Sequence, residues 1–95
     1  MNHLTETIER EGLNRCSFRK PAFRFTDHEI RERNQRLYLA MLMGNNYSSE
    51  ARIVFNTLEG YKEVWSTIWA TTEKFILLKG GNTIPLEAIA EVELQ

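Results

Sequence analysis

The side chains that most often do chemistry in enzymes are few in this sequence and stand far apart. There is one cysteine, Cys16, and two histidines, His3 and His28, while Asp27 is the single aspartate. A thiol becomes a nucleophile when a neighbouring base or cation lowers its pKa, and the sequence places neither histidine to do so for Cys16. Asp27 is better explained by the start of a helix, where a carboxylate is stabilising. We therefore expect an inert thiol and a protein that is not an enzyme.

Metal and cofactor sites also lack the residues that they need. No pair of His, Cys or carboxylate side chains has the spacing of metal ligands. Gly80-Gly81 follows an expected strand but leads into another strand, whereas a loop that cradles phosphates leads into a helix. The sequence therefore predicts no metal and no cofactor.

Chemistry of another kind is expected between residues 14 and 25, where cations alternate with aromatic rings. Proteins that bind single-stranded nucleic acid use this pattern, because bases stack on aromatic rings while cations pair with phosphates. The predicted nucleic-acid contacts are Arg15, Phe18, Arg19, Lys20, Phe23 and Arg24. The alternative is that the phenylalanines fasten this segment to the rest of the protein, since three of them are a large share of a small core.

Charge is unevenly distributed along the chain, although the net charge is only −1. Residues 10–36 carry eight basic and four acidic side chains, whereas residues 50–95 carry four basic and seven acidic ones. So small a net charge creates no long-range attraction to nucleic acid or membrane. We expect the basic segment to lie along the acidic part of the protein. The acidic part would repel phosphates and so oppose binding of nucleic acid.

Residues 26–44 are predicted to form one long helix. Thr26 and Glu29 match a capping box, in which each side chain accepts a hydrogen bond from the other residue's backbone N–H. Gly44 is expected to end the helix, because glycine readily adopts the left-handed conformation that follows a helix. A shorter helix is predicted over residues 5–11.

The last part of the long helix, residues 37–43, is apolar on almost all sides. An ordinary surface helix has only one apolar stripe, so we expect this part to be buried on more than one side. It would cover Trp69 and the strand at 75–78, or it would lie in a contact between subunits.

Residues 51–94 are predicted to form short strands separated by turns. Ala51, Ile53 and Phe55 share one face, because side chains alternate along a strand. The next strand carries apolar residues on both faces, so something should cover its second face near Trp69. Pro85 cannot donate to a neighbouring strand, which predicts an edge or a strand end there. The expected strands are 51–55, 61–71, 75–78, 83–86 and 90–94, with turns at Glu59-Gly60 and Gly80-Gly81-Asn82.

Five short strands, with one turn of helix before the last and a helix ahead of the first, resemble the Sm/SH3-like small barrels. The stretches Thr67-Ile68-Trp69-Ala70-Thr71-Thr72-Glu73-Lys74, Leu78-Lys79-Gly80-Gly81 and Ile84-Pro85 are also similar to a set of short bacterial proteins. The resemblance implies a mainly β fold of the α+β class, namely a five-stranded Sm/SH3-like barrel capped by an α-helix. It implies no particular activity, because such barrels include RNA binders, regulators of RNA polymerase and peptide binders.

A chain of 95 residues is expected to form a single domain. Residues 1–25 would be its short helix and irregular segment, and residues 26–95 would be the long helix and the barrel. A lone cysteine fits a reducing compartment, the N-terminus lacks the apolar core of a signal peptide, and no apolar run approaches the ~20 residues that cross a bilayer. We expect a cytoplasmic protein that does not bind membranes.

Two functions are weighed on this basis. The first is a protein-interaction or regulatory module whose partner is an unknown protein or a second copy of the chain. Aromatic residues dominate interface energies, and the predicted contacts are Trp65, Tyr61, Leu39 and Met43. The second is binding of RNA or single-stranded DNA through the basic and aromatic segment. A third reading, a part of larger machinery with no separable activity, also stays open.

Overall fold

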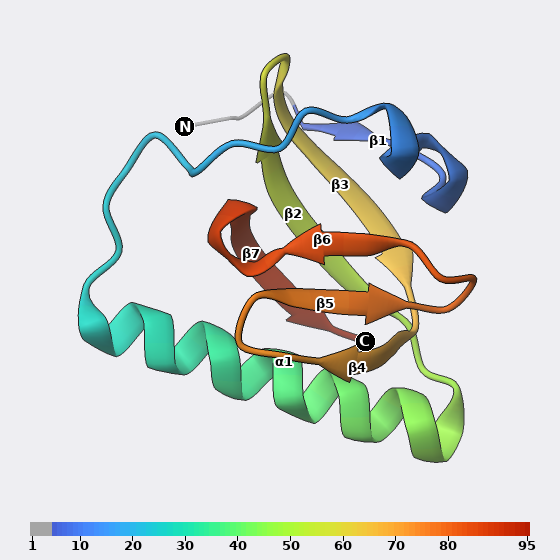
Figure 1. Ribbon diagram of the computed structural model, residues 1–95. Coiled ribbons are helices and arrows are strands. Elements are labelled where there is room, and N and C mark those ends of the chain that lie inside the picture. The colour runs from blue at the N-terminus through green and yellow to red at the C-terminus, as the bar shows by residue number, and fades with distance from the viewer. Residues whose placement is uncertain (1–4) are drawn as a thin grey trace.

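One long helix lies across two small sheets in the computed structural model, which describes residues 5–95 (Figure 1). His3 lies outside the described residues. Within them the elements are β1 (Glu6–Thr7), the 3-10 helix η1 (Arg10–Arg15), α1 (Asp27–Tyr47), β2 (Ala51–Thr57), β3 (Gly60–Ser66), β4 (Ile68–Thr71), β5 (Phe75–Leu78), β6 (Thr83–Pro85), the 3-10 helix η2 (Leu86–Ala88) and β7 (Ile89–Leu94).

The strands form a four-stranded sheet in the order β1-β3-β2-β7 and a three-stranded sheet in the order β4-β5-β6. The predicted mainly β fold with a helix is therefore confirmed. The closed five-stranded barrel is not confirmed. Thr67 interrupts the strand predicted over 61–71, because the chain passes there from pairing with β2 to pairing with β5. Its side chain donates to Ser48 O at 3.3 Å and its carbonyl accepts from Lys79 N at 2.9 Å. The two sheets are thus joined through a break of one residue.

Helix α1 begins as predicted and ends later than predicted. Thr26 Oγ1 accepts from Glu29 N at 3.1 Å, and Glu29 Oε1 accepts from Thr26 N at 2.8 Å, which completes the capping box. Gly44, however, does not end the helix, which runs on to Tyr47 with the left-handed Ser48 as its cap. Gly44 is buried against β4, and a Cβ built on it would lie 2.8 Å from Ile68 O. Glycine is therefore needed at position 44 because α1 packs closely on β4, and not because the helix ends there.

The helix predicted over residues 5–11 is wrong. Glu6 and Thr7 instead pair in parallel with Lys62 and Glu63 of β3, and η1 follows. A helix of this length is marginal in water. Here the strand pairing is reinforced by an ion pair between Glu6 and Lys62 at 2.7 Å, and η1 places Leu13 in the core with 3% of its surface exposed. Contacts to distant residues therefore outweigh the local helical preference.

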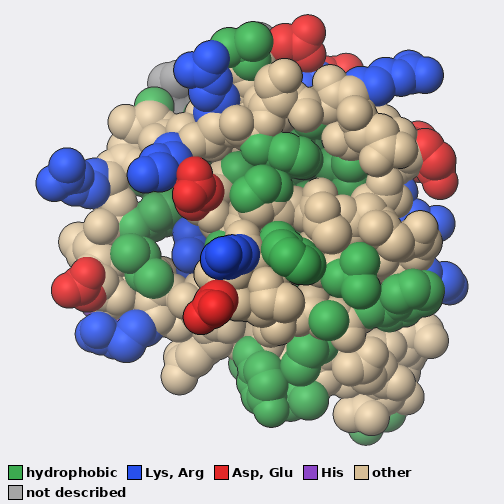
Figure 2. Space-filling view, viewed as in Figure 1, with side chains coloured by type: hydrophobic (Ala, Val, Ile, Leu, Met, Phe, Trp, Pro, Cys, Tyr) green, Lys and Arg blue, Asp and Glu red, His purple; other side chains and the backbone are tan. Residues whose placement is uncertain are grey.

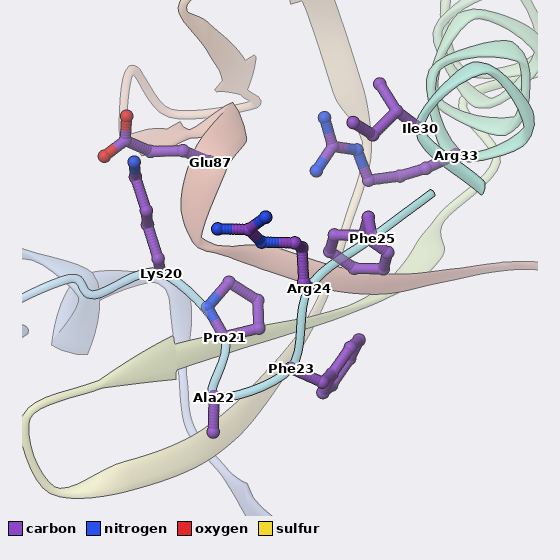
Figure 3. A pocket seen from close by; sticks show the side chains of 9 residues that line it. All are labelled: Lys20, Pro21, Ala22, Phe23, Arg24, Phe25, Ile30, Arg33 and Glu87. Atoms are coloured by element: carbon purple, nitrogen blue, oxygen red, sulfur yellow. The ribbon is translucent and has the colours of Figure 1, made fainter. Parts of the chain in front are cut away.

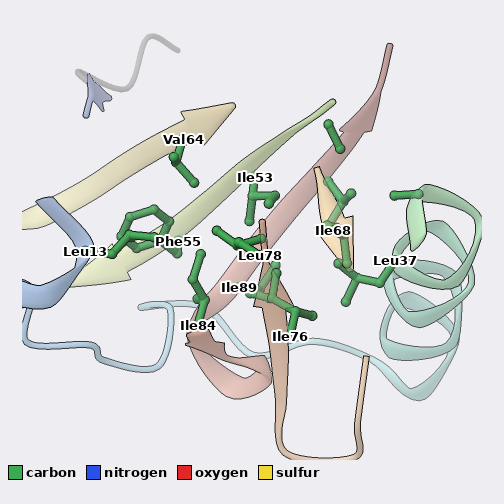
Figure 4. Close-up of a cluster of buried hydrophobic side chains, with 13 residues drawn as sticks. Leu13, Leu37, Ile53, Phe55, Val64, Ile68, Ile76, Leu78, Ile84 and Ile89 are labelled. Carbon is green, nitrogen blue, oxygen red and sulfur yellow. The ribbon is translucent and has the colours of Figure 1, made fainter. Parts of the chain in front are cut away.

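The core lies between the two sheets and the inner side of α1 (Figure 4). Side chains alternate as predicted, since Ala51, Ile53 and Phe55 of β2 are all buried. Phe18 packs on Phe55 with ring centroids 5.6 Å apart. Buried apolar area is the main favourable term in folding, so this cluster holds the sheets together. Its largest fully buried apolar side chains are Phe55, Leu37, Ile53, Ile68, Ile76, Leu78, Ile84, Ile89 and Val64.

The turns follow the sequence closely. Gly60 begins β3 with φ of 112° and Gly80 follows β5 with φ of 98°, conformations that only glycine adopts easily. Pro85 ends β6, which is an edge strand of its sheet. These three predictions are confirmed, because each depends on the backbone of one or two residues.

Candidate functional site

Two large aromatic side chains stand on the outer face of the three-stranded sheet. Trp69 of β4 is 45% exposed and Phe75 of β5 is 39% exposed, while their neighbours Ile68 and Ile76 are fully buried. The register between β4 and β5 shifts between Ile68 and Ala70, so Trp69 lies at an irregularity of the strand. A tryptophan so exposed on a sheet face leaves much of its indole in water.

Helix α1, which packs beside β4, carries further exposed apolar side chains. Met41 lies beside β4, where Thr71 Oγ1 donates to its sulfur at 4.0 Å. At 3.6 residues per turn, Tyr38 and Leu42 lie about 60° and 100° round the helix from Met41, on the side away from the buried Leu37 and Gly44, and they are 53% and 36% exposed. Hydrophobic side chains gather over β4, β5 and α1 on the face seen in Figure 2. We name the set Tyr38, Leu42, Trp69 and Phe75 the apolar face.

The prediction that residues 37–43 are buried on more than one side is wrong for the single chain. Leu37 and Ala40 are buried, but Leu39 is 47% exposed, and Tyr38 and Leu42 are exposed as well. The predicted cover over Trp69 is also missing, because α1 packs on the edge of β4 and on β7, not on the outer face of the sheet. Trp69 is therefore only partly covered by the rest of the described chain, with 45% of its surface exposed.

The four residues predicted to contact a protein fall into two separate pairs. Trp65, 40% exposed, and Tyr61, half-buried, lie on the outer side of β3 in the four-stranded sheet. Leu39, exposed, and Met43, half-buried, are one turn apart on α1. The structure therefore does not bring these four together into one surface.

Trp65 lies in a charged surrounding. Arg52 donates to Glu63 Oε1 at 2.7 Å and lies 3.4 Å from Glu91 Oε1. Thr7 Oγ1 donates to the other Glu63 oxygen at 3.0 Å. Burial alone would raise the pKa of Glu63, but hydrogen bonds from Arg52, Thr7 and Trp65 outweigh it and hold that pKa below its usual range. The outer face around Trp65 is thus a network of ionic hydrogen bonds.

The lowered pKa of Glu63 predicts how stability responds to acid. Because the folded pKa lies below the unfolded one, the contribution of this carboxylate is complete above the unfolded pKa and is lost as pH falls through the folded value. We expect Glu63→Gln to lower the free energy of unfolding at neutral pH, and the deficit to shrink between about pH 5 and pH 3. Urea unfolding of both proteins across this range measures it. Glu73→Gln, at an exposed position, is the control, and a deficit for Glu63→Gln that stays constant with pH would contradict the prediction.

The six predicted nucleic-acid contacts are also divided. Phe18 is half-buried against Phe55, so its ring is largely committed to the core. Arg15 ends η1, and Arg19 lies beside β2, where its N–H donates to Asn56 O at 3.1 Å. The other three, Lys20, Phe23 and Arg24, line one cavity beside the start of α1. Only half of the predicted set therefore shares a site.

Reactive groups form no catalytic arrangement within the described part of the chain. Burial raises the pKa of the Cys16 thiol, and its sulfur donates weakly to Gly12 O at 3.6 Å. His28 contacts Glu32 at 4.0 Å on the helix surface. Between residues 5 and 95 there is no group of three His, Cys, Asp or Glu side chains able to hold a metal ion. The same residues include no helix that is both long and apolar enough to cross a membrane.

Trp69, the centre of the apolar face, was absent from the predicted contacts although its sequence carried the signal. The alternation along residues 61–71 predicts Val64, Ser66, Ile68 and Ala70 on one face and Trp69 on the other, and of the first four all but the half-buried Ala70 are buried. The prediction that the face carrying Trp69 is covered is wrong, since 45% of this side chain is exposed. Comparisons add nothing to this assignment, since no family model, curated protein or solved structure matches the chain.

Proposed function

We propose that this protein is a protein-interaction module whose docking surface is the apolar face. The observation that carries the proposal is the exposure of Trp69, supported by Phe75 on the same sheet and by Tyr38 and Leu42 on α1. Contiguous apolar patches on small proteins commonly mark contact sites, and tryptophan and tyrosine are enriched among the residues that dominate binding energy. A partner that covers Trp69 would supply the contact that the single chain lacks.

We propose a second copy of the chain as the first partner to test. A net charge of −1 produces little repulsion between copies, and most oligomers of small proteins are symmetric dimers in which the same patch meets itself. The apolar face, with aromatic residues on a sheet and apolar residues on a helix, suits such self-complementary packing. The other candidate partner is a regulatory protein of different sequence that would bind the same apolar face.

We also make a proposal about the architecture of the two sheets. We propose that the two sheets are the two halves of an opened Sm/SH3-like small barrel. Support comes from the order β7-β2-β3 followed by β4-β5-β6, from the single residue between β3 and β4, and from η2 before the last strand. The lone Cys16 supports a reducing compartment such as the cytoplasm.

Sedimentation of Trp69→Ser tests the docking surface. We expect the wild-type chain to dimerise with rising concentration, and Trp69→Ser to weaken the dimer by about 2 kcal/mol or more, roughly thirtyfold in Kd, as loss of a central aromatic does. Trp65→Ser, on the other sheet and about as exposed, is the matched control and should leave the dimer intact.

The outcomes separate the candidates. A dimer lost in Trp65→Ser and kept in Trp69→Ser would move the interface to the four-stranded sheet. A wild-type chain that stays monomeric, and that a photoreactive group at position 69 fails to crosslink to any protein in cells, would refute the interaction proposal altogether.

Binding of RNA or single-stranded DNA is the second candidate function. It is supported by the cavity that Lys20, Phe23 and Arg24 share. The position of Phe18 in the core counts against a long groove that tracks a strand, so any such binding would be restricted to a short site.

A further inference from the structure

A cavity of about 480 Å³ lies between the segment before α1, the first turns of α1 and the 3-10 helix η2. Its size is within the range of small-molecule sites, roughly 300–1,000 Å³. Lys20, Arg24 and Arg33 all line this cavity together with Glu87, and the ammonium of Lys20 points toward the Glu87 carboxylate (Figure 3). Three cations and one carboxylate therefore line the same cavity.

Arg33 is held by hydrogen bonds and makes no ion pair among residues 5–95, although it also lines a neighbouring cavity with Glu29, Glu32, Glu91 and Glu93. Its Nη1 donates to Ile89 O at 3.3 Å, its Nε and Nη2 donate to Asn34 Oδ1 at 3.3 Å, and its guanidinium carbon lies 5.5 Å from the centre of the Phe25 ring. These contacts fix its geometry but leave its charge unpaired, since no carboxylate among residues 5–95 lies within ion-pair distance. Burial accordingly lowers the pKa of Arg33. A half-buried cation without an anion is costly.

The segment that carries the other two cations is anchored at Lys20 and at Ala22. Asn56 Nδ2 donates to Lys20 O at 2.9 Å, and Ala22 N donates to the Tyr61 hydroxyl at 3.2 Å. Neither Lys20 nor Arg24 makes an ion pair within the part of the chain that the structure describes. The backbone that carries Lys20 and Arg24 is thus fixed by the fold in advance of any ligand, which lowers the cost of binding.

One wall of the cavity is aromatic. Phe23 and Phe25 meet edge to face, with ring centroids 5.0 Å apart at 75°. Phe25 is half-buried and carries Arg33 over one face, whereas Phe23 remains 52% exposed. Phe23 lines the same cavity as the cations, with its ring on the other side of the segment from the charged end of Arg24 (Figure 3). An aromatic surface and cations in one site are the combination that binds a base together with its phosphate.

We propose that this cavity binds an organic phosphate that carries a flat ring, namely a nucleotide unit, through Lys20, Arg24 and Arg33. The phosphate neutralises the three cations, and the ring lies against Phe23. The nucleotide comes either free in solution or as one unit of a single strand, and both present the same chemistry. The site is separate from the apolar face, so it stands whether or not the protein dimerises through Trp69.

Calorimetric titration at low salt with four probes tests the site: adenosine monophosphate, adenosine, inorganic phosphate and a short single-stranded oligonucleotide of mixed sequence. We expect adenosine monophosphate to bind, adenosine to bind much more weakly, and inorganic phosphate to bind more weakly than the nucleotide. An oligonucleotide that binds more tightly than the mononucleotide would identify single strands as the source of the ligand, and the reverse order would identify free nucleotides.

Charge-matched variants locate the binding. Arg24→Gln and Arg33→Gln should each weaken nucleotide binding about tenfold, as expected for loss of one charge-assisted hydrogen bond. Arg31→Gln removes the same charge from an exposed position of α1 outside the cavity and should change binding by less than about twofold. Arg24 is exposed, so its variant stays informative even if Arg33→Gln unfolds.

Three results would overturn the proposal. The first is that neither adenosine monophosphate nor the oligonucleotide binds at low salt. The second is that Arg24→Gln and Arg31→Gln bind the nucleotide equally well. The third is that inorganic phosphate binds as tightly as the nucleotide, which would remove the role of the ring. None of them bears on sedimentation of Trp69→Ser, so failure here leaves the protein-interaction proposal to its own test.

Discussion

Valine in place of Gly44 is expected to lower the free energy of unfolding by about 3 kcal/mol. A Cβ at this position would lie 2.8 Å from Ile68 O and 2.8 Å from Thr67 Cγ2. The carbonyl belongs to β4 and cannot turn away as the end of a long side chain could. The gain in helix propensity on replacing glycine is at most about 1 kcal/mol, so the steric cost decides the sign.

Urea unfolding followed by circular dichroism measures the effect of Gly44→Val. Gly12→Ala is the control, because the Cβ added there would meet only the Ile8 side chain at 3.7 Å, an ordinary contact. We expect that control to stay within about 0.5 kcal/mol of the wild type. If Gly44→Val were as stable as Gly12→Ala, α1 could not lie as close to β4 as the structure places it.

Truncation of Phe55 to alanine is expected to cost about 3–5 kcal/mol. Its side chain is fully buried between the sheets, and its ring meets that of Phe18. Domains of this size are stable by only about 5–15 kcal/mol, so the loss removes a large part of the total. The physical reason is the cavity left behind, together with the lost transfer of the ring from water.

The same urea experiment gives the result for Phe55→Ala. Leu58→Ala is the matched control from the adjoining turn, where the leucine is 62% exposed, and it should change stability by less than about 0.5 kcal/mol. A cost below about 1 kcal/mol for Phe55→Ala would mean that the core is not packed around this ring.

Features of the fold that depend on neighbouring residues could be predicted from the sequence. Thr26 and Glu29 fix the start of α1 through hydrogen bonds across three residues. Gly60 and Gly80 set their turns through their own backbone angles. The alternation along β2 places Phe55 in the core. In each case the decisive interaction is local, so a single stretch of sequence contains it.

Features that depend on distant residues were mistaken. Gly44 continues the helix because β4, more than twenty residues later, packs on it. Residues 6 and 7 form a strand because β3 is there to pair with them. Thr67 separates two strands, and its hydroxyl and carbonyl form hydrogen bonds with Ser48 O and Lys79 N, which are distant in the sequence. No local pattern in these segments records the partner that decides their structure.

The candidate surfaces show the same division. Alternation indicated that Trp69 faces away from the core, but only the structure reveals that 45% of its surface stays exposed. The basic and aromatic pattern singled out Lys20, Phe23 and Arg24, which do share a cavity. It missed Arg33, because a cation from the following helix enters that cavity only through the fold.

The parallel pairing of β1 with β3 has a consequence for the order in which the molecule is assembled. Glu6 and Thr7 are made early in synthesis, yet Lys62 and Glu63, with which they align, are made more than fifty residues later. The adjacent strands β2 and β3, in contrast, can close on each other as soon as both have left the ribosome. The earliest residues of this sheet to be translated therefore cannot join it until β3 has been made.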